Sequence, residues 1–437
     1  MEEKSNGPPS KFINKVMFIF FGIASLLGWN ALLTKLDFFN YFLSDIKPFR
    51  SFAFLNFILD ITFQFLLIWK KNLFPLLIEI IIGTFGSILF LVLVPLSASL
   101  LGKNEMINKV ITSGLVVIMG FINALIQGGF FSYAGHFPLE MIVLFNIGQG
   151  ISAISLNIIE FIVLASVNIE DGEKELVVKA WIFFGFAILI LLISFFLLFY
   201  SFRDDYCKYY LFKADNKIFN ESNKETKVMH LYSVGEENNK ELSETEMKEQ
   251  ITKINEENTG EKFEPKFSYV FKKVWDLDLL ICYGYIVTFA LFPGVSTDQR
   301  IFDIGEYNSV TIITIYNVCD TVGRYLVSLM KQSKKLNLIV MLGRSILLFT
   351  LIFNDYLQFS LEANLTFTSI FLIINVILLG LTNGIGATLT FGLASSLAED
   401  EIKKQTGGSI GFFCIFGIFL GSCLAFGTGA IIDTFKK

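Results

Sequence analysis

The most regularly spaced polar residues in this sequence lie between Ser309 and Met330, in a stretch that is otherwise apolar. Asn317, Asp320 and Arg324 follow one another at steps of three and four residues, so a helix would place them on one face. A carboxylate and a guanidinium four residues apart are able to pair on that face. We predict that the face lines a hydrated cavity. The alternative is an ion pair that only locks two helices together.

Polar side chains recur at helical spacing in other apolar stretches. Gln127 follows Asn123 by one helical turn, and Asn383 stands beside a glycine in LTNGIG (381–386). A further polar face, over residues 144–161, consists of Asn146, Gln149, Asn157 and Glu160. An amide in an apolar helix costs free energy unless it is hydrogen-bonded. These side chains therefore either line the same cavity or bond neighbouring helices.

Isolated polar residues interrupt three more apolar runs. Trp29 and Asn30 break the first of them, and an amide there requires a partner or a cavity. Asp60 stands in the middle of NFILDITFQFLL (56–67), and Arg344 has no partner within its own helix. Each charge either pairs with another helix or, for Asp60 and Glu160, is a candidate protonation site coupled to transport.

The sequence lacks the spacings that enzymes and metal centres require. Its five cysteines and two histidines show no ligand pattern, and no nucleophile–base pair or pair of catalytic acids is recognisable. We therefore expect no enzymatic activity, no cofactor and no metal. The net charge of −5, without a basic cluster, argues against a nucleic-acid partner.

The elements that position these residues are long apolar helices. Hydrophobic residues make up 53% of the 437 residues and charged residues 17%. Apolar runs of about 20 residues recur, each long enough to cross ~30 Å of hydrocarbon, and the alternation of barrel strands is absent. We predict an all-α polytopic membrane protein. Its eleven transmembrane helices cover residues 16–36, 50–69, 73–101, 108–134, 139–167, 177–201, 268–294, 307–330, 336–358, 364–397 and 407–432.

The loops predict the orientation and the division of the chain. Lysines precede the first span and follow the second and eighth, so residues 1–15 are expected in the cytosol. Residues 16–201 would form a six-helix bundle and 268–432 a five-helix bundle, with an extracellular or lumenal tail over 433–437. Between the bundles, residues 202–267 are rich in Lys, Glu and Asn and are expected to be a disordered cytosolic loop.

Six short motifs occur in an order that resembles the equilibrative nucleoside transporters. They are GWN (28–30), QGGFFSYAGHFP (127–138), GQG (148–150), FPGV (292–295), YNVCDTVGR (316–324) and TNG (382–384). The resemblance covers essentially residues 12–432, and Asn-x-x-Asp-x-x-Gly-Arg is its most specific element. Departures are Gly28 where the family has Pro, Asn123 where many members have a small residue, and Ile385 where a Tyr is usual.

The resemblance implies a major-facilitator-like fold with the substrate held between two bundles. It implies that Trp29 contacts a nucleobase and Gln127 hydrogen-bonds the edge of that base. Asp320 and Arg324 would hold ribose hydroxyls. Asn30 and Asn317 would line the same cavity, and Asn123, Asn146, Gln149 and Asn383 are further candidates for its lining.

The expected function is a carrier of nucleosides or nucleobases, with purines favoured. It would work by alternating access, as facilitated diffusion or with proton assistance, and as a monomer in the lipid bilayer of the plasma membrane. Two alternatives stay open: a carrier of another polar solute such as a sugar or an amino acid, and a non-transporting receptor or scaffold. Glycines at 407, 411, 417 and 421 are expected to serve helix packing.

Overall fold

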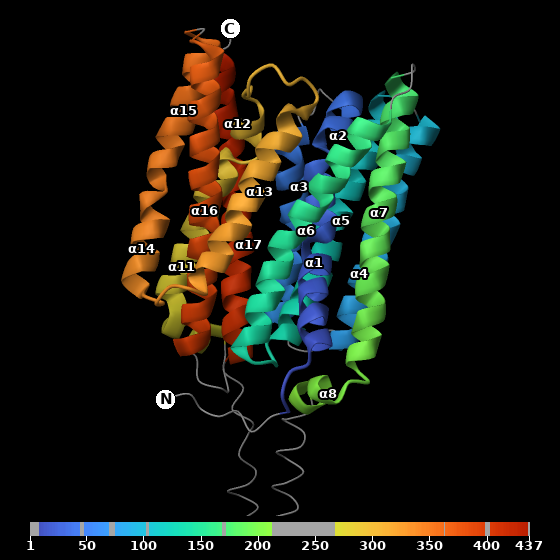
Figure 1. Cartoon of the computed structure of the whole chain (residues 1–437), viewed down its shortest axis with the longest axis vertical. Coiled ribbons are helices and arrows are strands. Elements are labelled where there is room, and N and C mark those ends of the chain that lie inside the picture. Colours follow the sequence, from blue (N-terminus) through green and yellow to red (C-terminus); the bar gives the residue numbers. More distant parts are fainter. Residues whose placement is uncertain are drawn as a thin grey trace, which may run out of the picture.

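The computed structural model describes residues 8–43, 48–69, 75–101, 105–167, 172–211, 267–361, 363–397 and 403–435, and within these ranges every regular element is a helix (Figure 1). The first half contains α1 (Phe12–Thr34), α2 (Leu36–Leu43), α3 (Pro48–Trp69), α4 (Leu76–Leu101), α5 (Glu105–Ala134), α6 (Leu139–Ser166), α7 (Gly172–Ser201) and α8 (Asp205–Leu211). The second contains α11 (Phe267–Leu291), α12 (Gly294–Thr297), α13 (Tyr307–Val327), α14 (Lys334–Gly343), α15 (Ser345–Phe359), α16 (Leu365–Leu397) and α17 (Lys403–Phe435).

The long helices are consistent with a membrane-spanning protein. In the part of the chain that the structure describes, nine helical segments are long and apolar enough to cross a bilayer. Helices α3 and α13 run beside them, which is consistent with the predicted eleven spans (Figure 1). Apolar runs fold as helices in lipid because a helix satisfies its own backbone hydrogen bonds.

One predicted span, residues 336–358, consists of two consecutive helices within a single apolar segment, Lys334–Phe359. It is divided into α14 and α15 at Arg344, whose side chain is 1% exposed. The guanidinium is directed inward, where it finds hydrogen-bond acceptors on α11. This placement keeps the charge away from lipid, where it would be costly.

The first half of the chain packs around α1. Helices α1 and α6 approach so closely that a Cβ at Gly22 would lie 2.0 Å from the carbonyl oxygen of Phe145. Phe21 stacks on Phe130 of α5 with ring centroids 5.3 Å apart, and Tyr133 donates a 2.8 Å hydrogen bond to Ser201 of α7. The helices of this half therefore share one aromatic core.

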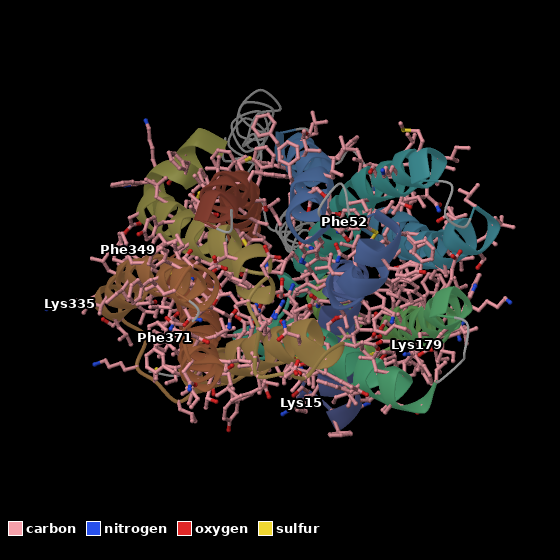
Figure 2. The ribbon with its side chains drawn as sticks, turned by 90° about the horizontal axis from the view of Figure 1, so that it is seen from above. Lys15, Phe52, Lys179, Lys335, Phe349 and Phe371 are labelled. Atoms are coloured by element: carbon pink, nitrogen blue, oxygen red, sulfur yellow. The ribbon has the colours of Figure 1, made fainter. Side chains whose placement is uncertain are left out.

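In the second half α11 packs on α17 and α13 packs on α16, while α14 and α15 lie outside α16 (Figure 1). Phe349 of α15 is 74% exposed and lies at the outer edge of the molecule in the view down the bundle (Figure 2). Such an apolar rim suits contact with lipid tails.

The most extensive contacts between the two halves are made by two helix pairs. Helix α3 packs against α17, and α6 packs against α13. At the second contact a Cβ on Gly150 would lie 2.4 Å from the hydroxyl of Thr321, so glycine is required for the helices to come this close. Helices α1 and α11 face each other between these contacts and leave a central space.

The segment expected to be disordered begins with ordered structure. Asp205–Leu211 forms α8, and Asp204 accepts a 2.8 Å hydrogen bond from the Asn14 side chain. Tyr206 and Tyr210 pack their rings near Phe137, which gives this short helix an apolar anchor. Residues 212–266 lie outside the described ranges, so the remainder of that expectation is a prediction.

Candidate functional site

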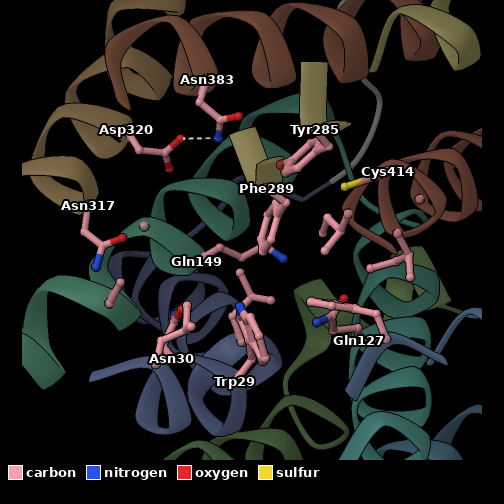
Figure 3. A pocket seen from close by; sticks show the side chains of 18 of the residues that line it. Trp29, Asn30, Gln127, Gln149, Tyr285, Phe289, Asn317, Asp320, Asn383 and Cys414 are labelled. Carbon is pink, nitrogen blue, oxygen red and sulfur yellow. Dashed lines mark hydrogen bonds between the residues drawn. The ribbon is translucent and has the colours of Figure 1, made fainter. Parts of the chain in front are cut away.

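A cavity of about 150 Å³ lies between the two halves of the molecule (Figure 3). Helices α1, α3, α5 and α6 supply its lining from the first half, and α11, α13, α16 and α17 supply it from the second. Eight of the residues singled out from the sequence line it: Trp29, Asn30, Gln127, Gln149, Asn317, Asp320, Arg324 and Asn383. Residues spread over 355 positions of the sequence, from Trp29 to Asn383, thus meet in one place.

One side of the cavity is charged and hydrogen-bonded. Arg324 Nε donates to Asp320 Oδ2 at 2.8 Å, and the predicted ion pair of α13 is therefore confirmed as a contact. Asn383 of α16 donates from Nδ2 to Asp320 Oδ1 at 2.7 Å (Figure 3). The side chains of Arg324 and Asp320 are 11% and 9% exposed, so the pair is shielded from bulk water but still borders the cavity.

The other side of the cavity is aromatic. The Trp29 ring packs against Phe57 of α3 with centroids 4.7 Å apart and faces Phe289 of α11 at 6.4 Å. Phe57 and Phe289 contact each other edge to face at 5.8 Å. Three rings from three helices thus form an apolar surface suited to a planar ligand, with Asn30 and Gln127 beside it (Figure 3).

Two amides complete the first half's share of the lining. Gln149 donates to the Ser25 hydroxyl at 3.2 Å, which holds it against α1. The Asn30 amide nitrogen is buried and has no hydrogen-bond partner within the described residues. An unsatisfied donor that borders a cavity is able to donate to a polar ligand.

The other candidates lie outside the lining. Asn123 donates to the Asn56 side chain at 3.2 Å and so connects α5 with α3. It does not line the cavity, as the sequence had suggested it could. Asn146 is buried but does not border the cavity either. The possible protonation sites lie elsewhere too. Glu160 accepts a 2.6 Å contact from Lys35, and Asp60 is fully buried with neither carboxyl oxygen hydrogen-bonded among the described residues.

Several lining residues were not recognisable from the sequence. Phe57, Tyr285 and Phe289 lie in aromatic-rich apolar runs, so nothing in their spacing separates them from core residues. Tyr316 differs: it begins the motif YNVCDTVGR and precedes Asp320 by four residues, so its spacing on that helical face is a signal that could have indicated it. The glycines of α17 also divide into two sets. Gly417 packs closely on α11, as expected, whereas Gly407 and Gly411 border the cavity.

Arg344 is not isolated. Its guanidinium donates to the carbonyl oxygen of Gly284 at 3.1 Å and to the hydroxyl of Thr288. Both acceptors lie on α11. Residue spacing within one helix cannot predict such a contact with another helix. Thr288 in turn donates to Asn383, which borders the cavity, so Arg344 lies just behind its charged side.

The described residues contain no group of three or more His, Cys, Asp or Glu side chains placed to hold a metal ion. The polar groups of the cavity are instead arranged for hydrogen bonding to an organic solute, with one ion pair, several amides and an aromatic surface.

Comparisons with known proteins agree with this picture. The sequence profile of the nucleoside transporter family matches residues 113–429. The chain is 24% identical to equilibrative nucleotide transporter 7 of Arabidopsis thaliana over 95% of this chain and 94% of that protein. It is 23% identical to equilibrative nucleoside transporter 2 of Rattus norvegicus, over 94% of this chain and 95% of that protein.

Solved structures share the fold at low identity. The major facilitator superfamily proton:xylose symporter XylE matches with a TM-score of 0.58 over 98% of this chain and 96% of its own, at 11% identity. This likeness confirms the major-facilitator-like architecture predicted from the sequence.

Proposed function

The chain belongs to the nucleoside transporter family and is a membrane transporter of nucleosides or nucleobases, and we propose that the cavity between its halves is the site that binds them. The observation that carries this proposal is the placement of the Asp320–Arg324 ion pair and an indole ring on two sides of one cavity. Asp320 and Trp29 are seen on opposite sides of it in Figure 3. A nucleoside has a planar base and vicinal hydroxyls, so it complements both sides.

The base lies against Trp29 in this proposal. An aromatic ring offers a flat, polarisable surface to a base, and Phe57 and Phe289 hold the indole in place. The amides of Gln127 and Asn30 border the same end of the cavity and carry both donors and acceptors for the edge of a base.

The ribose lies against α13. Each of the Asp320 oxygens already accepts one hydrogen bond, and a carboxylate has lone pairs left for a hydroxyl. The Arg324 guanidinium has five N–H donors, of which Nε serves Asp320, so it is able to donate to a sugar oxygen as well. Asn317 lies one turn from Asp320 on the same face.

We further propose alternating access as the transport cycle. The cavity lining reaches Gly407 and Gly411, at the beginning of α17, and hence the end of the bundle where α1 begins (Figure 1). Toward the other end the halves touch: Phe161 of α6 stacks on Tyr307 of α13 with centroids 6.3 Å apart. At the end where α1 begins, Phe131 of α5 and Phe391 of α16 also stack across the halves, with centroids 5.9 Å apart, so this opening is narrowed. With a cytosolic N-terminus, as the positive-inside rule favours, this arrangement corresponds to a partly occluded inward-facing state.

The remaining parts of the proposal concern context. The carrier acts as a monomer in the plasma membrane, with its C-terminus extracellular or lumenal. The two halves, residues 16–201 and 268–432, move as the rocking bodies. Asp60 is the preferred site for any proton coupling, because Glu160 is already paired with Lys35, whereas the buried Asp60 forms no ion pair with another described residue.

The first experiment is uptake of labelled adenosine into proteoliposomes, with competition by other nucleosides, nucleobases, xylose and amino acids. Saturable uptake inhibited only by nucleosides or bases supports the proposed substrate class. Inhibition by sugars or amino acids alone would favour the alternative carrier, and absence of saturable uptake of any of them would favour a receptor or scaffold. An imposed pH gradient separates facilitated diffusion from proton assistance.

Two variants tie uptake to the cavity. Arg324→Ala should abolish saturable uptake, whereas Arg203→Ala, which alters an exposed arginine outside the cavity, should not. Cys414 borders the cavity and supplies a native reporter. Substrate should slow its modification by a small thiol reagent, with Cys414→Ser as the background control. If substrate leaves the labelling rate of Cys414 unchanged, it binds somewhere else.

A further inference from the structure

Arg344 lies at the break between α14 and α15, one layer behind the cavity. Its side chain is 1% exposed although the residue belongs to the outer layer of the second half. Room for it exists because residue 284 is glycine: a Cβ there would lie 2.4 Å from Met341 Sδ and 3.3 Å from Arg344 Nη1. The protein therefore accommodates a buried guanidinium at a defined place.

A continuous series of hydrogen bonds connects this guanidinium with the cavity. Arg344 Nη2 donates to Thr288 Oγ1 on α11, and Thr288 Oγ1 donates to Asn383 Oδ1 on α16 at 2.9 Å. Asn383 Nδ2 then donates to Asp320 Oδ1 on α13 at 2.7 Å. Three helices are thus linked from Arg344 to the carboxylate that pairs with Arg324.

The chemistry of the two ends fixes the direction of the series. A guanidinium only donates and a carboxylate only accepts, so each group between them must accept on the Arg344 side and donate on the Asp320 side. A hydroxyl has a single proton, and Thr288 Oγ1 also lies 3.0 Å from the carbonyl oxygen of Gly284. Arg344 Nη1 donates to that same carbonyl, which leaves Asn383 as the better acceptor for the Thr288 proton.

We propose that Arg344 is a positioning residue for the substrate site: through Thr288 it holds the Asn383 amide with its NH2 group toward Asp320. The inference rests on the proposed function of Asp320 and Arg324 in binding ribose. Without Arg344, Thr288 is able to turn its proton to Gly284, and the Asn383 amide loses the contact that orients it. A flipped amide would present its oxygen to the carboxylate and weaken the geometry that receives the sugar.

A purely structural role makes a different prediction. If Arg344 only fastens α14 and α15 to α11, its removal lowers thermal stability but leaves the discrimination between substrates unchanged. Asn337 provides a matched control for this possibility. It is also fully buried on α14 and bonds α16, donating to Thr390 Oγ1 at 2.8 Å. The Thr390 hydroxyl in turn donates to the carbonyl oxygen of Gly386 and not toward Asp320.

The test compares Arg344→Met, Arg344→Lys, Thr288→Val and Asn337→Ala in proteoliposomes. Inhibition constants of adenosine and 2′,3′-dideoxyadenosine against labelled adenosine uptake measure how strongly the ribose hydroxyls are used. Loss of one hydrogen bond to a charged group corresponds to a roughly tenfold weaker adenosine inhibition constant, with the dideoxy compound nearly unaffected. Arg344→Met and Thr288→Val should each show this loss, and the double variant should be no worse than either. Arg344→Lys keeps the charge and a donor and should recover part of it.

Two results would overturn the inference alone. One is retention of full hydroxyl discrimination in Arg344→Met and Thr288→Val while Asp320→Asn abolishes it. The other is an equal loss in Asn337→Ala, which would indicate a general effect of loosening α14. If wild type and Asp320→Asn both treat the two compounds alike, the proposed ribose site itself is wrong, and this inference falls with it. Should Arg344→Met not fold, Thr288→Val decides, because it is uncharged and similar in shape.

Discussion

Gly384→Ala is the substitution whose effect follows most directly from the packing around the site. A Cβ built on Gly384 of α16 lies 1.9 Å from the backbone carbonyl oxygen of Asp320 and 2.8 Å from the backbone nitrogen of Arg324. Both atoms belong to the main chain of α13, so no side-chain rotation is able to relieve the overlap. The two helices must separate.

The size of the effect can be worked out from these distances. Ordinary contact between such atoms begins near ~3.4 Å, so α16 must move by about 1.5 Å relative to α13. A shift of that size would stretch the 2.7 Å hydrogen bond between Asn383 and Asp320 past the ~3.5 Å limit. Overpacking costs about 1–3 kcal/mol, and losing a hydrogen bond to a charged group costs about 1.5–3 kcal/mol more.

The assay measures stability and binding on the same purified protein. Gly384→Ala should lower the Tm in detergent and raise the KM for adenosine at least about tenfold, because one hydrogen bond to a charged group is lost. Gly185→Ala in α7 is the control, since no neighbouring atom lies within 4 Å of a Cβ there. That variant should match or slightly exceed wild-type stability, because alanine favours helix more than glycine does.

A Gly384→Ala variant that keeps both the wild-type Tm and the wild-type KM would show that α13 and α16 do not pack as closely as these distances require. The hydrogen bond between Asn383 and Asp320 would then lose its basis as well. A lower Tm with an unchanged KM would refute only the functional half, because the helices would then separate without disturbing substrate binding.

Three further outcomes are expected elsewhere in the molecule. Lys35→Met leaves the buried carboxylate of Glu160 unpaired and should reduce the free energy of unfolding by about 3–5 kcal/mol. Adding Glu160→Gln should restore part of the loss, as a double-mutant cycle can measure. Phe391→Ala removes a ring whose centroid lies 5.9 Å from that of Phe131 at the edge of the cavity, and it should speed thiol labelling of Cys414. An unchanged labelling rate would mean that the ring pair does not restrict access to the cavity. Burial raises the pKa of Cys207 to about 12, so its thiol stays protonated at pH 8 and maleimide should modify it only after denaturation, as peptide mapping by mass spectrometry can check.

The sequence could predict contacts within one helix but not contacts between helices. Asp320 and Arg324 lie on one helix, and the spacing of a single helix is enough to place them together. The apolar runs predicted the helices for a similar reason, since lipid leaves the backbone few alternatives. Contacts between helices follow no comparable periodicity. The partners of Arg344 on α11 and the turn of Asn123 toward α3 therefore appear only once the helices are packed.

Glycine illustrates the same limit on one helix. Gly417 and Gly407 belong to the same kind of spaced pair in α17, and the sequence gives no reason to separate them. In the structure a Cβ at Gly417 would lie 2.3 Å from the carbonyl oxygen of Cys282, whereas nothing lies within 4 Å of one at Gly407. The first is required for packing on α11, and the second borders the cavity. Which role a small residue has depends on what faces it across the bundle.

The distribution of the site over the two halves bears on how binding and movement are coupled. The aromatic side combines Trp29 and Phe57 of the first half with Phe289 of the second, whereas the charged side, with Asp320, Arg324 and Asn383, belongs to the second half alone. A nucleoside bound as proposed would contact both halves at once, with its base on Trp29 and its ribose on Asp320 and Arg324. Its binding free energy would then favour conformations in which the halves are closed around it, since a ligand shifts an equilibrium only by its differential affinity for the two states. Release requires that same contact to break, so moderate affinity at each half serves transport better than tight binding at either. A support such as Arg344, which orients the charged side from behind, keeps that geometry without adding a direct contact to the substrate.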